Sequence, residues 1–203
     1  MKKTMSAALL GLALILGSAA QAAVVGVTGQ MVQIAAPANV TNASPGSNAN
    51  ILLFDEVQNL ILGTALTTSS GIIAAGTRIS SHMVFLNRDD AIRAGLTRAG
   101  TASFDGAILG LITTTAGLAA TDAVLGAVGT TYDAFRNRGL EAGDIAATTF
   151  VGDTLTTRLR VGQPGDWMRV ITVAAVPLPA AGLLLLGAMG GLAALRRRKS
   201  LTV

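Results

Sequence analysis

The sequence predicts an all-β domain, an antiparallel, jelly-roll-like β-sandwich of about eight strands. Three observations predict this fold class. Apolar and polar residues alternate with a period of two in the clearest segment, 154–161. Threonine and valine favour pleated surfaces, and residues 23–175 alone contain 20 Thr. Gly, Asn and Pro interrupt the chain at short intervals, and no segment sustains a capped 3.6-residue period.

The predicted elements follow one another along the chain. In 154–161, Leu155 and Leu159 alternate with Thr and Arg, as expected of a half-buried strand. The further strand candidates are 24–34, 51–54, 79–86, 104–112 and 167–173. The segments 39–50 and 89–100 are predicted to be polar loops. The segment 113–130 is predicted to be a loop or a short helix, and in 55–66 a helix competes with a strand.

The charge of the chain is concentrated at its two ends. The 203 residues carry a net charge of +4, but the body at 23–175 has nine Arg against eleven Asp and Glu, no Lys, and a charge of −2. A mildly acidic body offers no basic stripe for phosphates, which argues against a nucleic-acid partner. The absence of cysteine excludes disulfide scaffolds, thiolate zinc sites and cysteine nucleophiles.

The first 22 residues are typical of a secretory signal peptide. Lys2 and Lys3 form a positive start, and the apolar run at 7–17 is too short to span a bilayer comfortably. Signal peptidase requires small residues at its cleavage site, so we expect the mature body to occupy 23–175. The small residues at this site are Ala20, Ala22 and Ala23.

The last 28 residues, 176–203, have three parts. Two prolines prevent a regular helix, and an apolar helix over 180–195 is expected after them. Its 16 residues span about 24 Å, and snorkelling Arg side chains extend this reach across the membrane. The basic cluster stays in the cytoplasm by the positive-inside rule. The motif is Val176, Pro177, Leu178, Pro179 and Ala180, and the basic cluster is Arg196, Arg197, Arg198 and Lys199.

This tail closely resembles the VPLPA-CTERM sorting signal, a variant of the PEP-CTERM class of Gram-negative bacteria. The motif, the apolar helix and the basic cluster stand in the expected order. The resemblance implies that an exosortase-type membrane protease cuts near the prolines and releases or transfers the body to the cell surface or extracellular matrix. The expected partners are signal peptidase, this protease, the membrane and an extracellular polysaccharide. The alternative is a plain C-terminal anchor that is never cut.

His82 is the only histidine, so any Ser-His-Asp triad requires it. Ser80 and Ser81 precede it, but neighbours on a strand point to opposite faces, so Ser81 and His82 cannot pair directly. The sequence has no Gly-x-Ser-x-Gly nucleophile elbow. We therefore expect a surface histidine on a strand and no catalytic residue.

Carboxylates occur in close pairs along the sequence. A glycosidase needs two carboxyl groups about 5–9 Å apart across a sugar cleft. Because adjacent acids on a strand point in opposite directions, these pairs do not favour a glycosidase site. Calcium is the better chemical alternative, although no EF-hand spacing occurs and solvated loop acids are the simpler interpretation. The pairs are Asp55 with Glu56, Asp89 with Asp90, and Glu141 with Asp144, and the calcium alternative uses Asn87, Asp89, Asp90 and Asp105. We expect no metal and no cofactor.

The function predicted from these observations is that of a non-enzymatic exported protein with a structural or adhesive role. The alternative is a secreted glycan-binding module or a hydrolase of unknown substrate. Only seven aromatic residues are present to stack on sugars, which disfavours this alternative.

Overall fold

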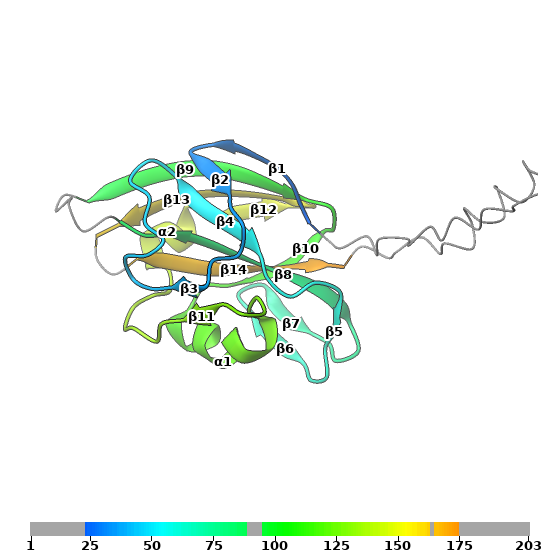
Figure 1. Ribbon diagram of the computed structural model, residues 1–203. Helices are drawn as coiled ribbons and strands as arrows, with labels where there is room; N and C mark the ends of the chain where they lie inside the picture. Colours follow the sequence, from blue (N-terminus) through cyan, green and yellow to red (C-terminus); the bar gives the residue numbers. More distant parts are fainter. Residues whose placement is uncertain (1–22, 89–94, 163–164, 175–203) are drawn as a thin grey trace, which may run out of the picture. The chain divides into compact units, whose positions relative to one another are not determined.

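The computed structural model describes residues 23–88, 95–162 and 165–174. These residues form fourteen β-strands and two helices, and most strands belong to two sheets packed against each other (Figure 1). The prediction of an all-β fold is confirmed. The described part of the chain contains more strands than the eight or so expected, because several are only two or three residues long.

The first sheet consists of β1 (Val24–Gly29), β9 (Leu96–Phe104), β13 (Thr154–Val161) and β12 (Thr149–Val151), in that order. All its neighbours are antiparallel. Strand β13 coincides with the segment in which the sequence alternates most clearly. Its Leu155 and Leu159 are fully buried, whereas Arg158 and Arg160 are exposed, so one face of this sheet is covered and the other meets solvent.

The second sheet consists of β10 (Ile108–Ile112), β14 (Asp166–Val173), β8 (Arg78–Leu86), β4 (Ile51–Asp55) and β2 (Met31–Gln33), in that order, with β5 (Leu60–Ile61) also beside β8. Strands β2 and β4 pair in parallel, and the other neighbours in this sheet are antiparallel. Strands β8 and β14 are buried along almost their whole length, as expected where both faces of a strand are covered.

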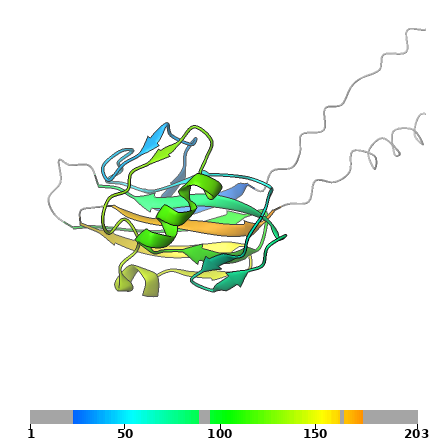
Figure 2. The ribbon, with the colours of Figure 1, turned by 90° about the horizontal axis from the view of Figure 1, so that it is seen from below.

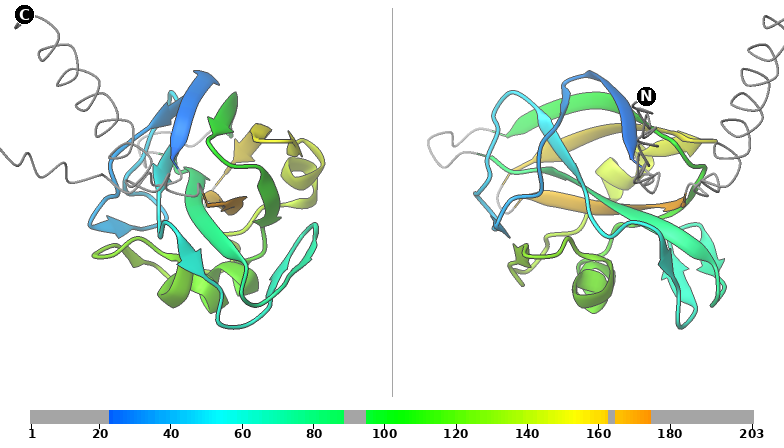
Figure 3. Two further views of the ribbon diagram at one scale, coloured as in Figure 1. Left: turned by 90° about the vertical axis from the view of Figure 1, so that its right-hand side faces the viewer. Right: turned by 45° about the vertical axis from the view of Figure 1, so that its right-hand side comes forward.

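Two cores explain this continuous burial. The inner core lies between the two sheets, and the outer core lies between the second sheet and helix α1 (Thr115–Leu125), as Figures 2 and 3 show. Met168 and Val170 of β14 enter the inner core, and Trp167 and Ile171 enter the outer core. Two small sheets complete the outer layer: β3 (Asn39–Val40) with β11 (Thr131–Tyr132), and β6 (Leu66–Thr68) with β7 (Gly71–Ile73).

Helix α1 lies in the segment predicted as a loop or short helix, and the helical alternative is confirmed. Thr114 caps its start, because the Thr114 Oγ1 accepts a hydrogen bond from the Gly117 N–H at 3.1 Å. Leu118 and Leu125 face the outer core. The second helix, α2 (Ala142–Ala146), is a short turn of helix between β11 and β12.

The structure corrects four segment predictions and decides between strand and helix in a fifth segment. The segment 24–34 forms two strands, β1 and β2, and the predicted loop 39–50 begins with β3. The segment 104–112 is the end of β9, a turn and β10, and not one strand. The segment 89–100 is not wholly a loop, because β9 begins at Leu96, and residues 89–94 lie outside the described residues. The competing helix over 55–66 does not form, because this segment contains β5 and the ends of β4 and β6.

Strand β9 was not predicted as a separate strand, because it is rich in small residues. The packing requires these small residues. A Cβ atom on Gly100 would lie 2.7 Å from the Met31 Cβ and 2.9 Å from the Thr28 carbonyl oxygen. Since real Cβ atoms do not approach so closely, a glycine lets β2 cross next to β9. The strand therefore lacks the branched and aromatic residues that a sequence pattern detects.

The two ends of the described body lie at the same turn. The Asp105 N–H donates to the Ala23 carbonyl at 3.1 Å, and the Val173 N–H donates to the Ala107 carbonyl at 2.9 Å. The start of β1 and the end of β14 therefore both contact the turn between β9 and β10.

Candidate functional site

Most of the processing residues predicted from the sequence lie outside the described residues. They are Ala20, Ala22, the sorting motif at 176–180, the apolar run at 180–195 and the basic cluster at 196–199. Ala23 is described and is half-buried beside the β9–β10 turn. Within 23–88, 95–162 and 165–174, no helix has the length and apolar character needed to cross a membrane.

The only histidine is buried, so the expectation of a surface histidine is wrong. His82 has no exposed surface, and its ring centroid lies 4.5 Å from that of Phe104. The His82 Nδ1 lies 2.6 Å from the Asp55 Oδ1, and its Nε2 lies 3.2 Å from the Thr172 Oγ1. Because a carboxylate only accepts, Nδ1 donates to Asp55, and Nε2 shares the second hydrogen bond with the Thr172 hydroxyl. The prediction failed because it assumed that β8 has a solvent-exposed face.

These contacts have the connectivity of a catalytic triad, with Thr172 in the place of the nucleophile. However, His82 and Thr172 are both fully buried, so a substrate cannot reach the hydroxyl. Ser81 points to the opposite side of β8 from His82, as the alternation predicts, and donates to Glu56 at 2.7 Å. The His82 contacts therefore join β4, β8 and β14 inside the inner core and do not form an open site.

The neighbouring acids Asp55 and Glu56 diverge as expected, and Glu56 enters the outer core. Its carboxylate accepts the Arg169 Nε–H at 2.5 Å and the Arg169 Nη2–H at 2.8 Å, which makes a bidentate ion pair. The Tyr132 and Ser81 hydroxyls donate to the same carboxylate, each at 2.7 Å. The four hydrogen bonds use both oxygens of a carboxylate that is 6% exposed.

Arg169 extends this ion pair to α1. It donates to the Thr121 Oγ1 at 2.6 Å and to the Asp122 Oδ1 at 3.2 Å. Arg138 donates to the other oxygen of Asp122 at 2.5 Å and lies over the Trp167 ring, 5.4 Å from its centroid. These contacts hold α1 to the second sheet. We call Glu56, Arg169, Tyr132, Asp122 and Arg138 the paired cluster.

Of the four residues of the calcium alternative, the structure describes only Asn87 and Asp105. Asn87 is buried, its Oδ1 accepts the Trp167 Nε1–H at 2.7 Å, and its amide donates to two backbone carbonyls. Asp105 is exposed in the β9–β10 turn, and Asp89 and Asp90 lie outside the described residues. Asn87 is therefore a structural residue and not a calcium ligand.

Glu141 and Asp144 meet a third carboxylate that sequence reasoning missed. Oxygen atoms of Glu141, Asp144 and Asp166 all lie within 4.8 Å of one another. Burial raises the pKa of Asp166 to about 9, with further contributions from Glu141 and Asp144, and burial also raises the pKa of Asp144. Asp166 directly precedes a predicted strand, but nothing in the sequence pairs it with α2. We call these three residues the acidic cluster.

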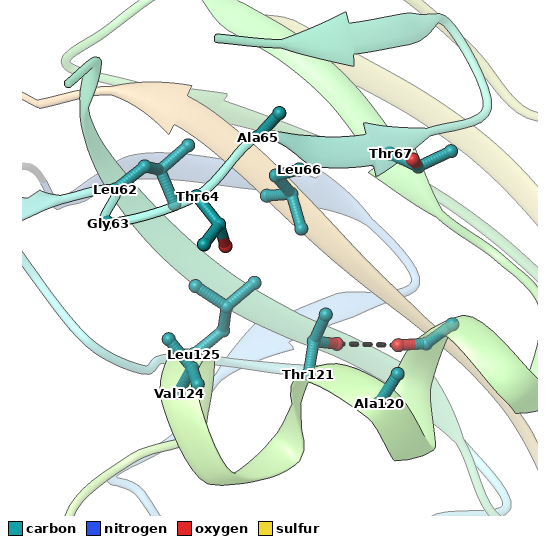
Figure 4. Close-up of a pocket in the computed structure, with 11 residues that line it drawn as sticks. Leu62, Gly63, Thr64, Ala65, Leu66, Thr67, Ala120, Thr121, Val124 and Leu125 are labelled. Carbon is teal, nitrogen blue, oxygen red and sulfur yellow. Dashed lines mark hydrogen bonds between the residues drawn. The ribbon is translucent and has the colours of Figure 1, made fainter. Parts of the chain in front are cut away.

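A groove of about 500 Å³ separates α1 from the segment between β5 and β6 (Figure 4). Its walls include Leu62, Leu66 and Val124, and the Thr121 hydroxyl in it donates to the Gly117 carbonyl at 2.7 Å. The lining residues include no charged and no aromatic side chain. The groove therefore has neither an acid–base pair nor a platform on which a sugar could stack.

Comparison with known proteins assigns no family to this chain. No protein-family model matches it, and no curated protein and no solved structure match it.

Proposed function

We propose that this chain is an exported cell-surface or extracellular-matrix protein of a Gram-negative bacterium, with a structural or adhesive and non-enzymatic role. The observation that carries the proposal is the tail at 176–203, which has the three parts of an exosortase substrate in their order. In this proposal signal peptidase removes 1–22, an exosortase-type protease acts near the prolines, and the body remains. The body is the substrate of this chemistry and not its catalyst.

The described body supports a structural role. His82, Glu56 and Arg169 are the residues that most resemble catalytic groups, and all three are buried and bound to partners within the chain. The groove beside α1 gives no specific support to the alternative of a glycan-binding module or hydrolase. We propose that the two packed sheets are a jelly-roll-like β-sandwich that serves as a stable module.

The position of the two ends also suits this proposal. Ala23 and Val173 both contact the β9–β10 turn, so the described body begins and ends at the same turn. Strand β14 runs from Asp166 to Val173, a length of about 23 Å at 3.3 Å per residue. A body attached through its tail would therefore have the end with Asp166 and α2 remote from the attachment.

The sorting proposal is tested by replacing the two prolines of the motif with alanine in the full chain, in a host that encodes an exosortase. We expect intact-mass spectrometry of the wild-type surface fraction to find a chain that begins at Ala23 and lacks the basic cluster. The variant with Pro177→Ala and Pro179→Ala should begin at the same residue but retain its tail.

The matched control is Pro37→Ala, a proline substitution in the loop between β2 and β3, which should be processed like the wild type. A wild-type chain that keeps its tail would contradict sorting by cleavage, and so would a double-proline variant that is cut normally. A mature chain that starts at Met1 would contradict the signal peptide.

A further inference from the structure

The acidic cluster joins two segments that are far apart in the sequence. Glu141 directly precedes α2, Asp144 lies within α2, and Asp166 is the first residue of β14. The Arg160 N–H of β13 donates to the Asp144 Oδ1 at 3.0 Å, which holds α2 against this strand (Figure 1). Since β13 belongs to the first sheet and β14 to the second, the cluster lies where α2 contacts both.

In the described part of the chain, no basic side chain forms an ion pair with these three carboxylates. Asp166 is 1% exposed, and its Oδ2 has no hydrogen-bond partner. Among the residues that the structure describes, no ion pair involves the cluster, and Arg158 and Arg160 of β13 are exposed. A buried carboxylate oxygen without a donor must be compensated by a proton or by a cation. Arg169 compensates Glu56 in this way, whereas none of the described side chains does so for Asp166.

We propose that Glu141, Asp144 and Asp166 form a binding site for a hard divalent cation, with Ca²⁺ preferred to Mg²⁺. Carboxylate oxygens are the ligands that these ions prefer. Oxygen atoms of the three carboxylates all lie within 4.8 Å of one another, close enough to contact one ion. Ca²⁺ accepts irregular coordination by carboxylates, whereas Mg²⁺ demands a near-ideal octahedral geometry. Glu141 is exposed, so the site is open to solvent and water completes the coordination shell.

The residues that would select a softer metal are not part of this site. The chain has no cysteine, and its single histidine is buried against Asp55 in the inner core. A zinc or copper ion prefers nitrogen or sulfur ligands, whereas this cluster presents only carboxylate oxygens. The donor set therefore fits a hard cation.

The bound cation connects α2 to the start of β14 and removes the repulsion among the carboxylates. Because it binds the native state, it stabilises the fold by mass action. The backbone N–H of Arg160 is the polar group of β13 that reaches the cluster.

The test uses the full chain, purified in a non-ionic detergent and freed of divalent ions with EDTA. Calorimetric titration with CaCl₂ should find one ion per chain with a Kd of about 10⁻⁴–10⁻³ M, the range of extracellular calcium modules, and weaker binding of MgCl₂. Tb³⁺ provides a second readout, because Trp167 is the only tryptophan and directly follows Asp166, so its excitation should sensitise a bound Tb³⁺ that Ca²⁺ then displaces.

Asp166→Asn should weaken Ca²⁺ binding about tenfold or more, and Glu141→Gln, at an exposed ligand, should weaken it several-fold. The control Asp153→Asn removes the same charge from an exposed turn between β12 and β13 and should bind like the wild type. Absence of binding heat and of Tb³⁺ luminescence in the wild type would overturn the proposal, and so would equal affinity in Asp166→Asn and Asp153→Asn. If Asp166→Asn does not fold, Glu141→Gln decides in its place, and unchanged affinity there would overturn the proposal.

Discussion

The paired cluster and the acidic cluster both contain a buried carboxylate, but among the described residues only that of the paired cluster has a basic partner. Glu56 accepts four hydrogen bonds, two of them from Arg169. Burial alone would lower the pKa of Arg169, but Glu56 and Asp122 outweigh it and raise the pKa above its ordinary value. In the acidic cluster, burial acts without such a partner, and the pKa of Asp166 is raised to about 9. The two clusters thus differ in whether another segment supplies an opposite charge to the buried carboxylate.

The largest predicted effect comes from breaking the paired cluster. Arg169→Met keeps the length and apolar stem of the side chain but leaves Glu56 without its cation. We expect a loss of about 3–5 kcal/mol in the free energy of unfolding, because one partner of a buried ion pair remains uncompensated. Chemical unfolding of the full chain in detergent, followed by Trp167 fluorescence, measures this loss.

The control is Arg158→Met, the same substitution at an exposed position of β13, which should change stability by less than about 0.5 kcal/mol. Adding Glu56→Gln to Arg169→Met should recover part of the loss, since the remaining side chain is then uncharged. Equal effects of Arg169→Met and Arg158→Met would contradict the interpretation that the Glu56–Arg169 pair is the compensated charge of the outer core.

The acidic cluster should respond to pH in the direction opposite to that of a salt-bridged carboxylate. The folded-state pKa of Asp166 is about 9, against an ordinary value of 3.8, so the native chain binds more protons than the unfolded chain between these pH values. Stability in EDTA should therefore decrease as pH rises through this window. We expect a change of about 1–3 kcal/mol, the contribution of one buried polar group without a partner.

Asp166→Asn removes this titration and should flatten the pH dependence in EDTA, whereas Asp153→Asn should retain it. Thermal unfolding at a series of pH values measures both, and Ca²⁺ should restore stability to the wild type at high pH. A wild-type stability in EDTA that increases with pH over this range would show that Asp166 is ionised in the fold and has an unidentified partner.

The sequence predicted what depends on local pattern and missed what depends on pairing across the fold. Strand β13 was predicted to the residue, because its alternation reflects a single buried face. His82 was predicted to lie on the surface because its strand was assumed to have one exposed face. No local sequence pattern indicates that α1 and the small sheets add a further layer. A tertiary layer changes the burial of a strand without changing the sequence of that strand.

The same limit applies to the candidate sites. Asp55 and Glu56 were recognised as a pair that diverges, and they do, but Arg169 is far away in the sequence and nothing local connects it to Glu56. Glu141 and Asp144 were recognised as close, yet the buried member of their cluster, Asp166, was not. Partners from distant strands become visible only when the strand order is known.

The smallest predicted effect distinguishes the charge of Glu56 from its individual hydrogen bonds. Ser81→Ala removes one of four donors and leaves the carboxylate paired with Arg169, so we expect a loss of only about 0.5–1.5 kcal/mol. Tyr132→Phe should cost somewhat more, because the Tyr132 hydroxyl also accepts the Ala127 N–H at 2.9 Å, and that donor would lose its partner. Unfolding under the conditions used for Arg169→Met should therefore rank Arg169→Met first, Tyr132→Phe second and Ser81→Ala third. If Ser81→Ala destabilised the chain as much as Arg169→Met, the count of donors to Glu56, and not the opposite charge, would govern the stability of the outer core.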